Sequence, residues 1–220
     1  MIAARDVVKH FESGLIKALN GVSFRVEAGE IVALMGPSGC GKSTLLNLIG
    51  TLDAPTSGEI WIEGKPIGAY RSFDRFRATT VGFVFQHHHL IPSLTLLENV
   101  ETPMCAAGAA RGTRRRRAAQ LLEEMGLATR MHAFPTGVSG GERQRAALAR
   151  ALANAPKIIL ADEPTGSIDT ETGRRILEGL VARCRRETLT MVIATHNEEV
   201  AAMADRRIFL RDGRIETLSR

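Results

Sequence analysis

The sequence has few cysteines and no long apolar run, and each shortage excludes a class of protein. Its three cysteines are odd in number and lack the paired spacing of a zinc site. This argues against a disulfide-stapled or zinc-stapled fold and fits a reducing compartment. No apolar run approaches the roughly 18 residues that a membrane-spanning helix needs, and residues 1–14 lack the apolar core of a secretion signal. We therefore expect the chain to lie in the cytoplasm.

Aromatic residues are also scarce. One tryptophan and one tyrosine offer few platforms on which bases could stack, so we expect no nucleic-acid partner. The net charge of +5 is modestly basic and has a local source in RGTRRRR, residues 111–117. Such a run is typical of the solvated beginning of a helix. Binding of anionic lipid headgroups or of nucleic acid is the alternative.

Apolar runs alternate with helix signals along much of the chain. Three largely apolar runs suit strands that are buried on both faces of a parallel sheet, and they cover residues 31–36, 157–162 and 190–195. A helix signal follows each run, and these signals cover 41–50, 170–184 and 197–204. Repetition of strand and helix predicts an α/β fold with a mainly parallel sheet.

The remaining segments have a different character. Residues 22–30 and 58–67 alternate polar with apolar side chains and carry turn glycines, which predicts antiparallel strands. Residues 207–217 predict a hairpin that turns at Asp212 and Gly213. From about 87 to 155 the pattern becomes helical.

Length and composition limit the number of domains. With 220 residues, 44% of them hydrophobic, the chain suits one large domain or two small ones. We predict a single domain over 1–220, in which 1–86 and 156–220 form the core and about 87–155 form a helical subdomain inserted into it.

A phosphate-binding loop is the strongest motif. GPSGCGKST, residues 36–44, matches G-x-x-x-x-G-K-[ST] directly after an apolar run and before a helix signal. Its glycines let backbone N–H groups surround phosphate oxygens. Lys42 can reach the β- and γ-phosphates, and the Ser43 hydroxyl can bind Mg²⁺. We therefore predict binding of a nucleoside triphosphate by Gly36, Pro37, Ser38, Gly39, Cys40, Gly41, Lys42, Ser43 and Thr44.

Two carboxylates end the second apolar run, in IILADEPTG at residues 158–166. Asp162 falls at the edge where α/β sheets bind ligands, so we expect it to hold Mg²⁺. Glu163 can accept the proton of an attacking water, which favours hydrolysis. Gln86 and His196 close two further apolar segments. We expect Gln86 to contact Mg²⁺ or the water and His196 the γ-phosphate; an ordinary surface-loop histidine is the alternative.

A second phosphate site is indicated by VSGGERQRAALARAL, residues 138–152. Ser139 and Glu142 form a capping box at the beginning of a helix. Gly140 and Gly141 weaken a helix unless another group must approach its bare backbone. The N-terminus of a helix suits an anion, most simply a phosphate.

In this order and spacing, these segments resemble the ATP-binding-cassette ATPases of ABC transporters, over essentially the whole chain. The chain is most similar to the macrolide-exporter and lipoprotein-releasing branch, and the cell-division ATPases are close relatives. The resemblance implies a P-loop NTPase core, an antiparallel β subdomain and a helical insert. It implies ATP hydrolysis that drives export, or extrusion of lipoprotein, lipid or drug, through a separate membrane subunit. The alternative is an ATPase that signals to envelope or division machinery without transport.

The resemblance also implies partners and further site residues. Two copies would form a head-to-tail dimer around two ATP, with Ser139, Gly140, Gly141 and Glu142 facing the γ-phosphate held by the other copy. Asp169 would lie in the loop that crosses the interface, and Phe11 against adenine unless it is an ordinary core phenylalanine. An integral membrane permease subunit would hold the protein at the inner face of the membrane.

Some residues depart from the family pattern. Val138 replaces the commoner Leu, Glu142 the usual Gln, Phe11 a Tyr, and Ser167 and Ile168 an Asn-Leu pair. QHHHLIPSLTLLENV, residues 86–100, contains three consecutive histidines, which invites a metal site. Adjacent side chains point in different directions and rarely converge on one ion. The resemblance instead places this segment along the groove that receives a short helix of the membrane subunit.

Overall fold

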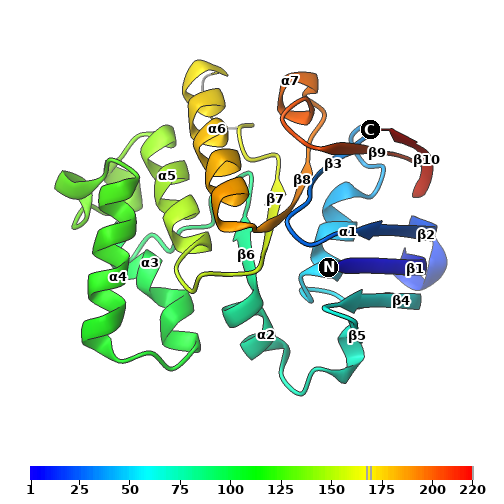
Figure 1. Cartoon of the computed structure of the whole chain (residues 1–220), viewed down its shortest axis with the longest axis horizontal. Helices are drawn as coiled ribbons and strands as arrows, with labels where there is room; N and C mark the ends of the chain where they lie inside the picture. Colours follow the sequence, from blue (N-terminus) through cyan, green and yellow to red (C-terminus); the bar gives the residue numbers. More distant parts are fainter. Residues whose placement is uncertain (167, 169, 220) are drawn as a thin grey trace.

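Two β-sheets and a group of helices make up the protein. The computed structural model describes residues 1–166, 168 and 170–219. Figure 1 shows helices α3, α4 and α5 at one end, the antiparallel sheet at the other, and a larger, mainly parallel sheet between them. No helix in these described ranges is long and apolar enough to cross a bilayer.

The central sheet has six strands in the order β10-β9-β3-β8-β7-β6. Its neighbouring strands run parallel, except that β9 and β10 form an antiparallel hairpin. The strands are β3 (Ile31–Met35), β6 (Val81–Val84), β7 (Ile158–Asp162), β8 (Thr190–Ala194), β9 (Arg206–Arg211) and β10 (Arg214–Ser219). All residues of β3 and β8 are buried. The predicted parallel sheet and the predicted hairpin are confirmed.

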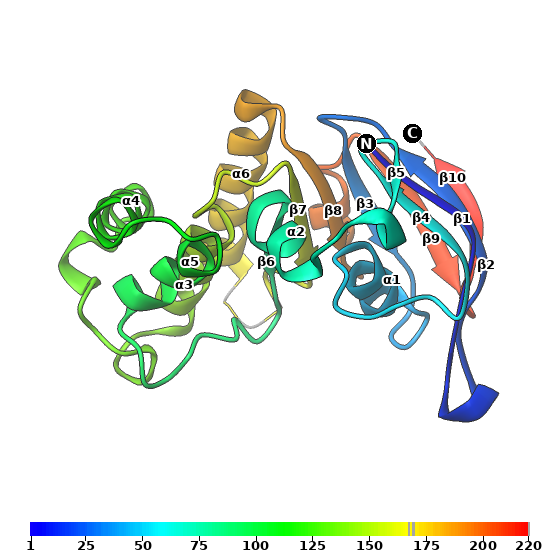
Figure 2. The same ribbon diagram turned by 90° about the horizontal axis from the view of Figure 1, so that it is seen from below.

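Helices cover both faces of this sheet because alternate strand residues point to opposite sides. Val32 and Leu34 pack in one apolar cluster with the helix after β3, α1 (Lys42–Ile49), and with the antiparallel sheet. Ile31 packs in the other cluster with α6 (Thr170–Glu187). A short helix, α7 (Glu198–Ala201), lies against β3. Figure 2 shows α1 and α6 on opposite sides of the central strands.

The antiparallel sheet has the order β2-β1-β4-β5. Its strands are β1 (Ile2–Phe11), β2 (Ile16–Val26), β4 (Ser57–Ile62) and β5 (Lys65–Pro66). The sequence pattern predicted β4 and β5 at 58–67, but of the strand predicted at 22–30 only 22–26 belong to β2, and 27–30 form a turn. It did not predict β1, nor the helix α2 (Phe73–Thr80) that leads into β6.

Three helices, α3 (Leu96–Ala106), α4 (Arg111–Glu124) and α5 (Gly140–Ala151), form the helical segment between β6 and β7. Thr95 and Glu98 begin α3 with a capping box. The arginine run lies on the first turns of α4, where Arg111, Arg115 and Arg116 are exposed, as expected for a solvated beginning of a helix. Short 3₁₀ turns connect the larger elements at Glu12–Gly14, Ile67–Ala69, Ala128–Arg130 and Pro135–Gly137.

Candidate functional site

The phosphate loop connects β3 to α1, as the motif requires, and packs tightly against neighbouring strands. Gly36 has φ 143°, and a Cβ there would lie 2.0 Å from the Leu210 carbonyl oxygen of β9. Gly41 has φ 105°, and its Cβ would lie 2.4 Å from the Ala18 carbonyl oxygen of β2. Both positions therefore need glycine for conformation and for space.

A positive charge lies inside this loop. The Lys42 ammonium donates to the carbonyls of Gly36 at 2.7 Å and Pro37 at 2.9 Å, and its side chain is buried. The Cys40 thiol is buried as well, 3.9 Å from the ammonium. Helix α1 begins directly after this loop, and its N-cap residue, Gly41, has no side chain that could cap the first N–H groups. A cation beside a helix N-terminus makes this loop a suitable anion site.

An oxygen pair next to the loop is suited to a divalent cation. Asp162 ends β7, as predicted. Burial raises the pKa of Asp162 above its ordinary value; the Ser43 hydroxyl, which hydrogen-bonds the carboxylate, and the Lys42 charge act in the opposite direction. Hydroxyl and carboxylate oxygens are the ligands that Mg²⁺ prefers. The residues present therefore fit a magnesium ion.

Glu163 lies in a strained backbone position and is held by β8 and the residues after it. Its φ is 43°, in the left-handed region, and its N–H donates to the Ala194 carbonyl at 2.9 Å. One carboxylate oxygen lies 2.7 Å from His196 Nδ1, and the other accepts from the Thr195 hydroxyl at 3.3 Å. Strain of this kind gathers at functional sites. The contact between Glu163 and His196 could not be read from their spacing in the sequence.

Gln86 reaches the segment that follows Glu163. It lies two residues beyond the end of β6, in a turn. A Cβ built on Gly166 would lie 3.2 Å from Gln86 Nε2, so the two residues are neighbours. The structure thus brings the segments that carry Gln86, Glu163 and His196 to the same edge of the sheet, as their positions after apolar runs predicted.

The signature residues, Ser139 to Glu142, lie elsewhere. The predicted capping box is confirmed: Ser139 Oγ accepts from the Glu142 N–H at 3.2 Å, and the Glu142 carboxylate accepts from the Ser139 N–H at 2.8 Å. That bond from Ser139 lowers the pKa of Glu142 below its ordinary value. A Cβ on Gly141 would lie 3.3 Å from Thr172 of α6. Close approach of α6 is thus one structural reason for a glycine here.

Within one chain the signature and the phosphate loop are separated. Figures 1 and 2 both place α5 and α1 on opposite sides of β6 and β7. Lys42, Ser43 and Asp162 therefore lie on the same side as the candidates for hydrolysis, which are Gln86, Glu163 and His196. Ser139 to Glu142 lie apart from both groups. Asp169 and Ser167 lie outside the described residues.

Phe11 is not a core residue. It ends β1, is 38% exposed, and its ring lies 4.9 Å from the Lys9 ammonium. The alternative of an ordinary core phenylalanine is therefore wrong.

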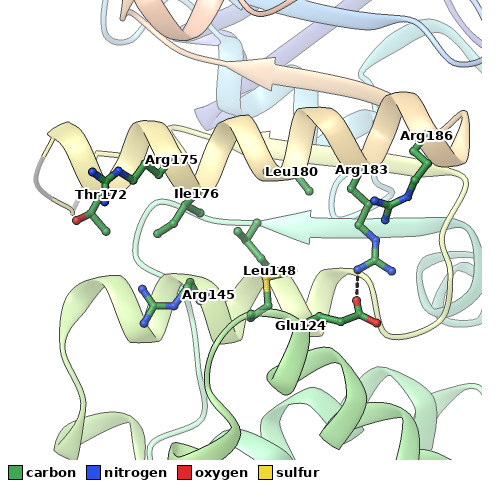
Figure 3. A pocket seen from close by; sticks show the side chains of 11 residues that line it. Glu124, Arg145, Leu148, Thr172, Arg175, Ile176, Leu180, Arg183 and Arg186 are labelled. Carbon is green, nitrogen blue, oxygen red and sulfur yellow. Dashed lines mark hydrogen bonds and ion pairs between the residues drawn. The ribbon is translucent and has the colours of Figure 1, made fainter.

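Two grooves border α5, and neither contains the phosphate loop. One, of about 400 Å³, is formed by α2, β6, α3 and α5, and its lining includes Phe83, Phe85, His89 and Arg150. The other, of about 670 Å³, lies along the junction of α5 and α6; Figure 3 shows Leu148 of α5 and Ile176 and Leu180 of α6 among the residues that line it.

Comparison with known proteins gives consistent similarities. The family described as ABC transporter matches residues 19–166. A lipoprotein-releasing system ATP-binding protein, LolD 2 of Caulobacter vibrioides, is 46% identical over 207 residues, which are 93% of this chain and 91% of that protein. The macrolide export ATP-binding/permease protein MacB of Brucella melitensis is 43% identical over 98% of this chain, but this covers only 34% of MacB.

A solved structure is similar throughout. A dimeric, post-hydrolysis state of an ATP-binding cassette bound to ADP and Pi superimposes with a TM-score of 0.93 at 40% identity, covering 100% of this chain and 98% of that one. The α/β cassette fold expected from the sequence is confirmed.

Proposed function

The chain belongs to the ABC transporter family and is an ATP-hydrolysing transporter subunit. From this premise we propose which of its residues bind and hydrolyse its own ATP and which contact the ATP of a second copy. The proposal rests on the separation, within one chain, of the phosphate loop from the signature residues. Lys42, Ser43 and Asp162 meet at one edge of the sheet beside Glu163, whereas the signature residues begin α5 on the other side of β6.

The phosphate loop binds the triphosphate of ATP. Backbone N–H groups of residues 36–44 and the Lys42 ammonium surround its β- and γ-phosphates. The exposed Phe11 ring stacks on adenine, since an aromatic face left open at the end of a strand suits a flat base.

Ser43, Asp162 and Gln86 hold the Mg²⁺ that accompanies ATP. The hydrogen bond between Ser43 and Asp162 supports this, because it sets the two oxygen ligands side by side. The ion neutralises charge on the phosphates when it is bound. Gln86 approaches from the turn after β6, near Gly166.

Glu163 is the general base of hydrolysis. Its carboxylate takes a proton from water while the water oxygen bonds to the γ-phosphorus; the bond from that phosphorus to the bridging oxygen breaks, and ADP leaves with the electron pair. The contact of 2.7 Å between His196 and the Glu163 carboxylate supports this role, because it fixes the direction in which the carboxylate points. His196 also contacts the γ-phosphate.

The signature serves ATP held by a second copy. Residues 139–142 present a helix N-terminus, which suits a phosphate, but their own phosphate loop lies on the other side of the sheet. A head-to-tail homodimer places each signature against the other copy's nucleotide and uses Asp169 at the interface. The similar cassette solved as a dimer with ADP and Pi supports the pairing of two copies.

A membrane permease subunit is the second partner. The groove of about 400 Å³ beside residues 86–100, with Phe83 and Phe85 in its lining, suits a short apolar helix of that subunit. The protein then lies on the inner face of the membrane. The work performed is export, or extrusion of lipoprotein, lipid or drug; the names of the lipoprotein-releasing and macrolide-export relatives support lipoprotein and drug.

Glu163→Gln tests this proposal. The amide keeps size and hydrogen bonding but cannot take the proton, so ATP should bind, close the dimer and remain. Size-exclusion chromatography with ATP should show a stable dimer, with turnover lower by at least about 10²-fold. The control is Glu199→Gln, which borders the same small cavity as Glu163. Near-normal turnover in Glu163→Gln, or no dimer with ATP, would contradict the proposal.

A further inference from the structure

Helix α5 makes a buried contact with the loop that carries Glu163. Its Gln144 is 1% exposed, and Nε2 donates to the Pro164 carbonyl at 2.6 Å. Pro164 directly follows Glu163, and the same tight turn is closed by a bond of 3.0 Å from the Gly166 N–H to the Glu163 carbonyl. The position of this turn therefore depends on α5.

A second contact lies near the other end of α5. The two terminal nitrogens of the Arg150 guanidinium donate to the carbonyls of His88 and His89, each at 2.5 Å. Both histidines have positive φ, 62° and 47°, a backbone conformation that is strained for a residue with a side chain. Burial lowers the pKa of Arg150 to about 10, so it stays charged at neutral pH. The charged Arg150 guanidinium thus holds the strained turn at His88 and His89 through two hydrogen bonds.

That turn sets the position of Gln86. The His88 N–H donates to the Phe85 carbonyl at 3.1 Å, and the His89 ring lies 4.8 Å from the Phe85 ring, so residues 85–89 form one compact unit. The side chain of Gln86 extends from this unit toward Gly166. The two contacts of α5 therefore end on the loops that carry Glu163 and Gln86.

Helix α5 also packs against α6. Leu148 of α5 and Leu180 of α6 are buried in one apolar cluster beside the groove of about 670 Å³ that Figure 3 shows. Apolar packing has little directional preference, whereas each of the two hydrogen-bonded contacts ends on a particular loop of the site.

We propose that Gln144 and Arg150 are positioning residues that make α5 the link between the two ATP sites of the dimer. The N-terminus of α5 touches the partner's ATP, and the two side chains hold Glu163 and Gln86 of the chain's own site in their working places. ATP in one site thus supports hydrolysis in the other. This inference rests on the proposed function, which places the signature against the partner's nucleotide.

Two methionine variants of the full chain test the link. Gln144→Met and Arg150→Met keep much of the side-chain volume and remove the donors. In a Glu163→Gln background both should still occlude ATP in a dimer, because neither residue touches nucleotide. With Glu163 restored, kcat should fall at least about tenfold, while KM for ATP changes less than about twofold. Arg150→Lys, which keeps the charge but not the fork, is measured too in case Arg150→Met melts below the assay temperature.

Asn154→Ala is the matched control. The Asn154 amide donates to the Ala78 and Pro103 carbonyls at 2.5 and 2.8 Å, and so ties the end of α5 to α2 and α3 instead of to the site loops. Its loss should loosen α5 to a similar degree but leave kcat within about twofold.

A double-mutant cycle separates positioning from general destabilisation. If Arg150 acts through Gln86, Arg150→Met should lower kcat little further once Gln86→Ala is present. If it only loosens the structure, it should lower kcat by the same factor with or without Gln86→Ala. Turnover near wild type in both methionine variants, an equal loss in Asn154→Ala, or full additivity with Gln86→Ala would each overturn the inference. If Glu163→Gln itself fails to occlude ATP, the proposed function fails instead.

Discussion

At the scale of single residues, backbone conformation governs the site as much as side-chain chemistry does. The glycines of the phosphate loop share one motif but meet different surroundings. Gly36 combines a φ of 143° with contact to the Leu210 carbonyl, whereas Gly39 has a φ of 80° and nothing within 4 Å of an added Cβ. The motif is therefore most restrictive where the loop touches β9.

Substitution by alanine should destabilise the protein much more at Gly36 than at Gly39. Gly39→Ala adds only conformational strain and should lower the free energy of unfolding by about 1–2 kcal/mol. Gly36→Ala forces β9 or the loop to move, and should cost more than about 4 kcal/mol, an exceptional loss for one substitution. Chemical denaturation of both variants, with titration of a fluorescent ATP analogue, measures the difference. Equal losses would show that the contact with Leu210 is unimportant.

At the scale of elements, Arg206 connects the central sheet to the antiparallel sheet and is held by Glu30. Glu30 immediately precedes β3 and accepts from Arg206 of β9 at 2.7 Å and from the Glu27 N–H at 2.7 Å. The same Arg206 donates to the Arg25 carbonyl of β2 at 2.5 Å. Burial alone would raise the pKa of Glu30, but the bonds from Arg206 and Glu27 outweigh it and hold this pKa below its ordinary value.

Glu30→Gln should therefore destabilise the protein in a pH-dependent way. At pH 7 the loss should be about 1.5–3 kcal/mol, the range for a hydrogen bond to a charged group. A carboxylate with a lowered pKa stabilises the fold above its unfolded pKa, and this contribution disappears as pH falls through the folded value. The difference in the free energy of unfolding between Glu30→Gln and wild type should thus become smaller below about pH 4.5.

Glu178→Gln is the control for this measurement. Glu178 is 52% exposed and pairs with Arg174 one turn away, so its loss should change stability by less than about 1 kcal/mol at any pH. A Glu30→Gln effect that is the same at pH 7 and pH 3.5 would contradict the assignment.

Elements with a regular local pattern could be predicted, and irregular ones could not. The runs that became β3, β7 and β8 are apolar because they are buried on both faces. In β1 the alternation is broken by a register shift around Asp6, whose φ is 48°, and α2 is mostly polar and depends on burial of Phe76. Tertiary contacts decide such elements.

The site divides in the same way. Lys42, Ser43 and Asp162 could be predicted because a short motif fixes each of them relative to a strand end. Contacts between distant segments have no signal in a single sequence. Gln144 with Pro164 spans 20 residues, and Arg150 with His88 spans 62. Their partners became visible only in the folded chain.

At the scale of the whole molecule, the phosphate loop and the signature residues of one chain do not meet. The phosphate loop lies on one side of β6 and β7, and the signature begins a helix on the other. The central claim is that a second copy supplies the missing half to each site, so that the signature acts on the partner's ATP.

A mixed dimer tests this claim most directly. Lys42→Ala disables the phosphate loop, and Ser139→Arg blocks the signature with bulk, so either homodimer has both sites broken. Differently tagged chains, one with each lesion and both with Glu163→Gln to stop turnover, are combined and purified through both tags. If the signature acts on the partner's nucleotide, both lesions can fall in one composite site, and occluded ATP should approach one per mixed dimer. No occlusion in confirmed mixed dimers would mean that each signature serves its own chain, and would contradict the account.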